Sequence, residues 1–259
     1  MTPFEPTPRE VLDFCAQEPI ERVFLEELAR QRLGRFAALG RRSGLTALCH
    51  LGANIVPSGI GCDEFAGVVA GDDARMLIGD ERAVSELWHA ACAQLPPPRE
   101  DRPGQPVYAI TAAPPGGESG LRPAAARDFD LLLPACAAAH AEELGVDPLL
   151  EDGEAFRRRV RRQIDVGRSW LWEQDGMILF KAEASAWTPH AVQIAQVWVD
   201  PPLRNRGFAR RGLRDLCRLL LGRVPAVCLF VRRENAAAMR VYEAVGMRRV
   251  STCRSILFA

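Results

Sequence analysis

The feature that most constrains this chain is a predicted strand–helix–strand unit in its C-terminal half. Apolar runs over residues 192–199 and 226–231 predict two strands, and leucines at helical spacing, among them Leu213 and Leu220, predict a helix over 207–221. Strands joined by such a crossover helix lie parallel in one sheet, with the helix packed on a face of that sheet. The chain is therefore predicted to have an α/β fold.

Neighbouring segments predict that the sheet is mixed. Residues 169–173 and 177–186 read as antiparallel strands joined by a turn that ends at Gly176. Asn235 is a suitable N-cap for the helix that follows it, and residues 248–258 are rich in strand-forming types. The expected class is α/β with a mixed, α+β-like sheet.

A linker-like segment divides the chain of 259 residues. Residues 112–120 read AAPPGGESG, a composition typical of a flexible connection. At roughly 150 residues per domain, the length allows one or two domains. We therefore expect an N-terminal α/β domain over residues 1–117 and a second domain over residues 118–259.

The N-terminal half also alternates between helical and strand patterns. Residues 44–56 alternate as a strand, Asp80 is placed to cap a helix, and residues 106–111 form a further strand pattern. The proline-rich stretch 96–103 is predicted to be a long loop. This half carries no catalytic motif, so its patterns indicate fold class alone.

Charge and composition exclude several functional classes. The 33 basic and 33 acidic residues cancel, which argues against a bulk electrostatic binder of nucleic acid or membranes. No apolar run is long enough to cross a bilayer, and the first residues lack a secretion-signal pattern. The eight cysteines form no CxxC pair and have no histidine at ligand spacing, so no metal site is expected. A reducing cytoplasm is the expected compartment.

The helix start that follows strand 192–199 is the most informative site. It reads Arg204-Asn205-Arg206-Gly207-Phe208-Ala209. Backbone N–H groups without helical partners and the positive end of the helix dipole make such a turn an anion site. Gly207 lets the backbone approach a phosphate closely, and the arginines add positive charge. The alternative is an arginine-rich helix start that faces only solvent.

Together with a second segment, this loop resembles the GNAT superfamily of acetyl-CoA-dependent N-acyltransferases. The family's pyrophosphate loop, Gln/Arg-x-x-Gly-x-Gly/Ala, is matched by Arg204, Gly207 and Ala209. The second segment is a strand ending at Val231, a helix led by Asn235, and Tyr242 followed by Gly246 and Met247, where Met247 replaces the family's usual phenylalanine. The resemblance covers about residues 118–259 and implies the GNAT fold there.

The whole chain is also similar to a bacterial subgroup in which a GNAT domain follows an N-terminal domain of unknown function. The similar stretches are residues 8–12, 52–57, 180–183 and 196–201. Because the helix–strand order of the first half loosely matches that of the second, we hypothesise that residues 1–117 are a degenerate GNAT-like half. Such a half would supply a lid or one wall of the acceptor pocket.

The resemblance implies how acetyl-CoA would be bound. In the family the two parallel strands splay apart, and the pantetheine arm would lie in the V against the free edge at Val197 and Val199. Asn235 would bind the pantetheine or cap its helix, and Tyr242 would protonate the CoA thiolate. The pyrophosphate would rest beside Arg204 on the backbone N–H groups of Asn205, Arg206, Gly207, Phe208 and Ala209.

The general base is less clearly defined. Many family members carry a glutamate on the strand before the phosphate loop, but the corresponding position is close to Gln193, which cannot act as a base. Glu183, near the only lysine, Lys181, is our first candidate, with a structural salt bridge as an equal alternative. His190 ranks second. Three residues lie near the end of the domain's first helix: His140, Glu142 and Glu143. The resemblance implies that this region often lines the acceptor pocket, but a solvated helix end is the favoured interpretation.

The expected function is transfer of an acetyl group from acetyl-CoA to a primary amine by direct attack in a ternary complex. The acceptor would be a small molecule or a peptide amine. The alternative is a non-catalytic acetyl-CoA-binding sensor that kept the loop and lost the base, which Gln193 motivates. A third class, an enzyme acting on charged tRNA, is disfavoured by the zero net charge, so no nucleic-acid or membrane partner is expected. The oligomeric state stays open, with a homodimer as one alternative.

Overall fold

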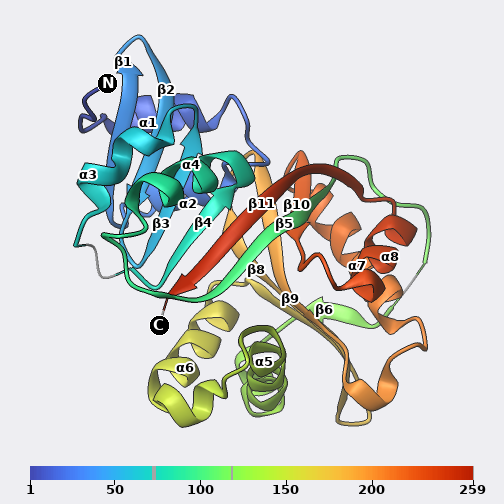
Figure 1. Ribbon diagram of the computed structural model, residues 1–259. Coiled ribbons are helices and arrows are strands. Elements are labelled where there is room, and N and C mark those ends of the chain that lie inside the picture. Colours follow the sequence, from blue (N-terminus) through green and yellow to red (C-terminus); the bar gives the residue numbers. More distant parts are fainter. Residues whose placement is uncertain (72–73, 118, 259) are drawn as a thin grey trace.

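The computed structural model describes residues 1–71, 74–117 and 119–258. Its N-terminal half begins with two helices and ends in a long strand (Figure 1). In chain order, the elements are α1 (Pro8–Cys15), α2 (Val23–Arg30), β1 (Arg35–Arg41), β2 (Gly44–Leu51), β3 (Asn54–Gly59), η1 (Cys62–Phe65), α3 (Ala66–Val69), β4 (Met76–Asp80), α4 (Glu81–Ala91) and β5 (Pro98–Ile110).

The C-terminal half repeats this order after one short extra strand. Its elements are β6 (Leu121–Pro123), η2 (Ala126–Asp128), α5 (Phe129–Leu144), α6 (Pro148–Asp165), β7 (Ser169–Gln174), β8 (Met177–Trp187), β9 (Ala191–Trp198), η3 (Pro201–Leu203), α7 (Phe208–Leu221), β10 (Ala226–Phe230), α8 (Ala236–Val245) and β11 (Arg248–Phe258). The strands and helices predicted after residue 169 are confirmed, with ends that differ by one or two residues.

Two predictions in the N-terminal half are wrong. Residues 44–56 are not one strand, because the chain turns after Leu51 and β3 pairs antiparallel with β2. Residues 96–103 are not a long loop, because β5 already begins at Pro98 and pairs with β11. β10 pairs only with the last residues of β5, from Val107 onward. The earlier part of β5 therefore pairs along one edge only, where proline residues, which lack an N–H group, are tolerated.

Each half contains the same sequence of connections. Two helices precede three antiparallel strands, and the third of these pairs in parallel with the next strand through a helical connection. In the first half the parallel pair is β3 with β4, and in the second half it is β9 with β10. The shared order agrees with the hypothesis that residues 1–117 are a degenerate copy of the second half.

The last strands of the two halves are exchanged. The described strands form one mixed sheet in the order β1-β2-β3-β4-β11-β5-β10-β9-β8-β7-β6. β5 of the first half therefore lies beside β10 of the second half, while β11 lies beside β4, and β5 and β11 pair with each other. Figure 1 shows both strands crossing between the halves, with the C-terminal end of the chain on the side of β3 and β4.

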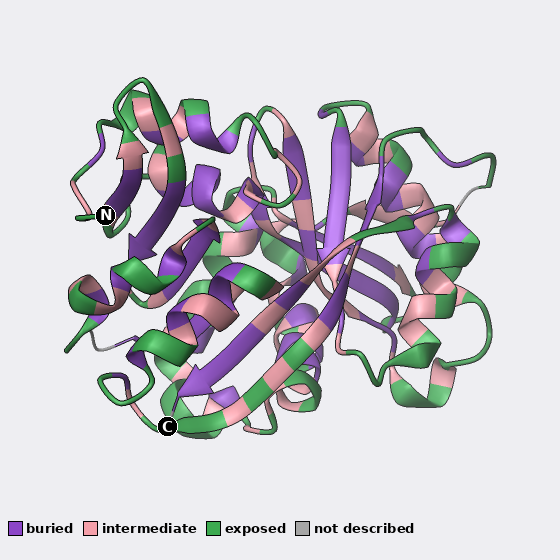
Figure 2. Cartoon of the chain, turned by 45° about the horizontal axis from the view of Figure 1, so that its top comes forward, coloured by how far each residue is buried: buried purple, intermediate pink, exposed green. Residues whose placement is uncertain are grey.

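Helices cover both faces of this sheet. In the second half, α7 packs on one face with Leu213 and Leu216 buried, and α5 and α6 cover the other face with Leu132 and Phe156. In the first half, α1 and α2 share a core with β1–β3, and α4 shares another with β4 and β11. Figure 2 shows most of the sheet buried and the outer helix faces exposed, while the beginnings of β5 and β11 are also exposed. Among the residues described, no helix is both long enough and apolar enough to span a membrane.

We expect that residues 118–259 do not fold stably without residues 1–117. Without the first half, β11 loses both β4 and β5, and the edge of β10 is left open to other chains. The truncated chain should aggregate or lack a cooperative unfolding transition in a thermal melt followed by circular dichroism. Co-expression of residues 1–117 as a separate chain should restore the transition. A monomeric, cooperatively folding 118–259 fragment would contradict this expectation.

Candidate active site

The parallel strands β9 and β10 pair only over a short stretch at the start of each strand and are not paired beyond it. They pair from Ala191 to Gln193 on β9. Beyond this ladder, β9 contains a bulge against β8, and Gln196 has a left-handed backbone with φ of 54°. A bulge bends its strand and leaves one residue out of the regular pairing. The carboxyl ends of the two strands line one common cavity, in agreement with the separation of these strands that the GNAT resemblance implies.

The predicted anion loop forms the start of α7. Gly207 is the N-cap with φ of 79°, and Asn205 is also left-handed with φ of 63°. The first helical hydrogen bond runs from the N–H of Arg211 to the oxygen of Gly207, so the N–H groups of Phe208 and Ala209 have no partner within the helix. A Cβ atom on Gly207 would meet no atom within 4 Å. The backbone is thus open to a ligand at this point.

A cavity of about 460 Å³, the loop cavity, lies against this helix start. The structure brings most of the predicted donor-binding residues together in its lining: Val197, Val199, Arg204, Asn205, Gly207, Phe208, Ala209, Asn235 and Tyr242. Arg206 is exposed and does not line the cavity. Arg210, one of the arginines expected to add positive charge at this loop, lines the cavity, and so does Arg240, which sequence reasoning did not assign to the site. The side-chain oxygen of Asn235 accepts from the N–H of Ala238, so this residue caps α8 while facing the cavity.

Arg204 has a different partner from the one the family resemblance suggests. Its Nη2 donates to both carboxylate oxygens of Glu142 at 2.7 Å, and its Nε donates to the oxygen of Val199 at 3.0 Å. The indole N–H of Trp198 donates to the same carboxylate at 3.1 Å. Glu142 was interpreted as part of a solvated helix end. The structure instead shows that it ties α5 to the loop and to β9.

A second cavity of about 190 Å³, the inner cavity, adjoins the first. Tyr242 lines both cavities and is 6% exposed. Its ring packs edge-on against Tyr108 of β5, with the ring centroids 5.7 Å apart. Burial raises the pKa of the Tyr242 phenol above its ordinary value. The phenol therefore stays protonated at neutral pH and is able to act as an acid.

Glu143 is an exposed residue near the end of α5, as the interpretation of a solvated helix end requires, but it also lines the inner cavity. Burial raises the pKa of this carboxyl, although the charges of Arg102 and Arg232 partly oppose the rise. The amide nitrogen of Gln196 donates to one of its oxygens. The only sequence signal for a place of Glu143 in the cavity was its position near the end of the first helix of the domain. Its partners are distant in the sequence and could not be identified from it.

Glu183 lies in a different place from the predicted site. It is buried, and its carboxylate accepts from Lys181 and Arg159 at 2.8 Å each and from the thiol of Cys136 at 3.3 Å. Burial alone would raise the pKa of Glu183, but the charges of Lys181 and Arg159 outweigh it and hold the pKa at about 2. Neither cavity is lined by Glu183. The geometry therefore favours the salt-bridge alternative over the base.

The other base candidates are also engaged elsewhere. The ring of His190 contacts the carboxylate of Glu26 at 3.0 Å, and the ring of His140 packs against Phe156. Neither histidine lines the loop cavity or the inner cavity. The described residues contain no cluster of three or more ligating side chains that could hold a metal ion.

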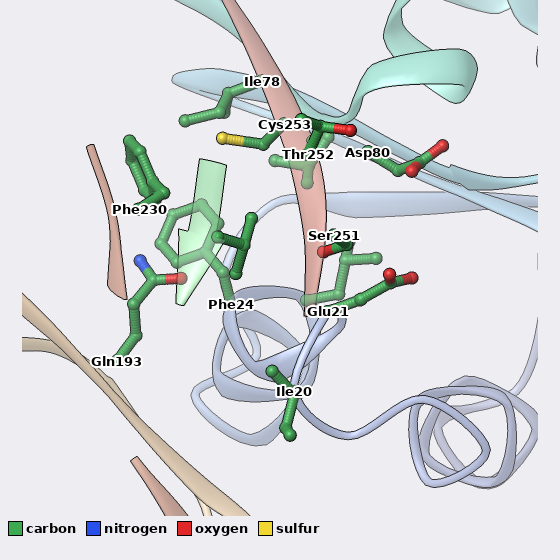
Figure 3. Close-up of a pocket in the computed structure, with 14 residues that line it drawn as sticks. Ile20, Glu21, Phe24, Ile78, Asp80, Gln193, Phe230, Ser251, Thr252 and Cys253 are labelled. Carbon is green, nitrogen blue, oxygen red and sulfur yellow. The ribbon is translucent and has the colours of Figure 1, made fainter. Parts of the chain in front are cut away.

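Gln193 faces a third cavity, of about 70 Å³, between the halves (Figure 3). Its amide donates to Ser185 at 2.9 Å. Figure 3 shows Gln193 and Phe230 on one side of this hollow, with Glu21 and Ser251 opposite. Phe230 also lines the inner cavity, so it forms a common wall. This third cavity is too small for a substrate, and Gln193 lines neither the loop cavity nor the inner cavity.

The corresponding loop of the first half is closed by the chain itself. It follows β3, where Gly61 has φ of 82°. The N–H groups of Gly61 and Cys62 both donate to one oxygen of Glu86, at 3.1 and 2.9 Å. Glu86 belongs to α4, the counterpart of α8. A carboxylate of the protein thus occupies the position at which the second half presents its open anion loop.

Comparison with protein families agrees with this geometry. Residues 137–247 match the acetyltransferase (GNAT) family, and residues 34–132 match a domain of unknown function (DUF4081). The C-terminal part of the chain thus matches the GNAT family and is preceded by this N-terminal domain, as the motifs predicted. The chain is 39% identical to the N-alpha-acetyltransferase RimI of Mycobacterium tuberculosis over 66 residues, which is 26% of this chain and 40% of that protein.

Solved structures are similar over the whole chain. A Drosophila protein superimposes with a TM-score of 0.66 at 12% identity, covering 98% of both chains. A GNAT-family acetyltransferase from Colwellia psychrerythraea gives 0.59 at 10% identity, covering 100% of both. A tandem GNAT protein from the clavulanic acid biosynthesis pathway gives 0.53 at 12% identity, covering 99% of this chain and 97% of that one. These similarities show the GNAT fold within a two-domain architecture.

We expect Glu183→Gln to destabilise the protein by about 3–5 kcal/mol, because it leaves the buried charge of Lys181 without its partner. The measurement is urea unfolding at pH 7. Glu154→Gln, which breaks an exposed pair with Arg158, should cost less than about 1 kcal/mol.

The pH dependence has a definite sign. Because folding lowers the pKa of Glu183 from 4.5 to about 2, its contribution is complete above pH 4.5 and is lost as the pH falls toward 2. The stability difference between wild type and Glu183→Gln should shrink over that window. Equal stability of the two proteins at pH 7 would show that the ion-pair cluster is not structural.

Proposed function

We propose that this protein is an acetyl-CoA-dependent N-acetyltransferase that acetylates a primary amine by direct attack. One observation carries the proposal: the anion loop and the phenol of Tyr242 line one cavity, and Tyr242 continues into a second cavity that contains Glu143. The first cavity suits the acyl donor and the second suits the acceptor. The match of residues 137–247 to the GNAT family supports this assignment.

The chain's own groups fit the donor. Free N–H groups at the start of α7 suit a pyrophosphate, and Arg210 and Arg240 add charge along the same cavity. The edge of β9 at Val197 and Val199 borders the cavity and would receive the pantetheine amides. Asn235 completes this wall. Acetyl-CoA is a substrate of the proposed reaction and leaves as CoA after each turnover.

The two cavities suit direct transfer. Glu143 would take a proton from the acceptor amine, whose nitrogen forms a bond to the acetyl carbonyl carbon. A backbone N–H of β9 would stabilise the oxyanion, and the carbon–sulfur bond then breaks. Tyr242 would donate its proton to the leaving thiolate. Among the described residues, neither cavity is lined by a cysteine, which favours a ternary complex over an acyl-enzyme.

The first test is calorimetric titration of acetyl-CoA into the protein and into Gly207→Glu. Wild type should bind with a Kd of about 1 μM, near −8 kcal/mol. The substitution places a carboxylate in the open space before the loop and should abolish binding. Gly167→Glu is the matched control, because Gly167 has φ of 68° and an equally open Cβ position outside the cavity lining. No binding by wild type would reject the proposal, and binding without turnover would favour the sensor.

The second test separates the acid from the base. Tyr242→Phe and Glu143→Gln should each lower kcat by about 10²–10⁴-fold, while acetyl-CoA still binds. Because burial raises the pKa of Glu143 above 4.5, the acid limb of the wild-type pH–rate profile should lie above pH 4.5, with the rate rising as the carboxyl loses its proton. Glu143→Gln should remove this limb. A Glu143→Gln profile that keeps the limb would assign it to another group.

A further inference from the structure

The inner cavity contains two arginines that the reaction proposed above does not use. Arg102 comes from β5 in the first half, and Arg232 follows β10 in the second half. Both line the inner cavity together with Glu143 and Tyr242. The side chain of Arg102 is 9% exposed, and that of Arg232 is 36% exposed. Two guanidinium groups from distant parts of the chain thus meet at the proposed acceptor site.

These guanidinium groups are only partly satisfied by the protein. The Nη2 of Arg102 donates to the main-chain oxygen of Glu143 at 3.0 Å, and the Nη2 of Arg232 donates to the same oxygen. Glu100 pairs with Arg102 and lies 3.8 Å from Arg232. The Nε atoms of both arginines are buried without a hydrogen-bond partner within the described part of the chain. A buried charged donor without an acceptor is costly, so an acceptor atom is missing from this arrangement.

The direct contacts of the two arginines favour an anion as that missing partner; the carboxylate of Glu143 is close enough for their charges to act on it, but it forms no ion pair with them among the described residues. Glu100 supplies one carboxylate for two arginines, while Glu142 is committed to Arg204. Glu143 offers its main-chain oxygen to the arginines, and its carboxylate oxygen instead accepts from Gln196. A planar guanidinium donates two parallel N–H hydrogen bonds to the two oxygens of a carboxylate. An amide or a methyl group does not offer two such acceptor atoms.

We propose that the acceptor is a small amine that also bears a carboxylate, with the carboxylate held by Arg102 and Arg232 and the amine presented to Glu143 and Tyr242. This inference rests on the proposed acetyl transfer and specifies its substrate class. The inner cavity of about 190 Å³ suits a short molecule with its two charges at opposite ends. The first half of the chain then contributes to substrate choice through Arg102 on β5.

A purely structural role for the arginines would give a different result. If Arg102 only fixed the end of α5, its loss would weaken every acceptor equally. If it binds a carboxylate, its loss would weaken only acceptors that carry one. The ratio of kcat/KM between a carboxylate acceptor and its neutral amide therefore separates the two roles.

The experiment measures acetylated product by mass spectrometry with saturating acetyl-CoA. Glycine, β-alanine and γ-aminobutyrate are compared with their carboxamides. In wild type, at least one carboxylate acceptor should exceed its amide by about tenfold or more in kcat/KM. Arg102→Gln should bring this ratio within about threefold of unity, mainly through KM, and Arg232→Gln should act in the same direction. Arg99→Gln, an exposed arginine on the same strand, is the control and should keep the wild-type ratio.

The outcomes distinguish this inference from the proposed function. Failure of acetyl-CoA to bind or transfer to any amine rejects both. Acetylation of amines with no preference for a carboxylate, or a preference that survives both substitutions, rejects the acceptor class alone. Thermal melts with and without acetyl-CoA identify a variant that fails to fold, and the second arginine variant then decides the question.

Discussion

The antiparallel pairing of β5 with β11 is the interaction on which the arrangement of the molecule depends. Each strand ends one half of the chain and completes the sheet of the other half. Without this pairing there would be two separate sheets, each with an open edge. With it, β5 reaches the second half and brings Tyr108 against Tyr242 and Arg102 into the inner cavity. The site is therefore built from both halves, although the recognisable motifs lie in one.

A second constraint acts at shorter range. The ladder between β9 and β10 stops after Gln193, and the bulge at Gln196 turns the rest of β9 aside. The last residues of β9, which would otherwise pair with β10, instead line the loop cavity and the inner cavity. The left-handed Gly207 then directs the start of α7 toward the larger one. Three local departures from regular structure thus create the space in which the proposed chemistry would occur.

Features that depend on neighbouring residues were predictable from the sequence. The cap at Asn235, the stop at Gly246 and the loop around Gly207 each follow from local backbone preferences, and the structure has all three. Most of the lining predicted for the loop cavity is therefore found there, apart from Arg206, which does not line it. The same reasoning explains why the helices and strands after residue 169 were placed within one or two residues.

Features that depend on distant partners were not predictable in this way. The strand at Pro98 forms because β11 supplies its hydrogen bonds from the far end of the sequence. Glu143 lies at an exposed helix end, and it becomes part of a cavity only because Arg102, Gln196 and Arg232 come next to it from distant parts of the sequence. Conversely, a carboxylate near Lys181 in an apolar strand is compatible with both an active site and a buried ion pair, so Glu183 was a candidate base. The ion pair of Glu183 with Arg159, which favours the second interpretation, could not be seen in the sequence.

The carboxylate of Glu86 is an internal mimic of a ligand. In the first half, the protein completes its own anion loop and gains the hydrogen bonds as part of folding. In the second half, the equivalent N–H groups have no partner within the helix, so under the proposed function a bound ligand would add to the stability of that half. Two halves of one architecture have thereby become different in kind. One half has an anion loop that is closed by its own carboxylate, and the other has an anion loop that is open.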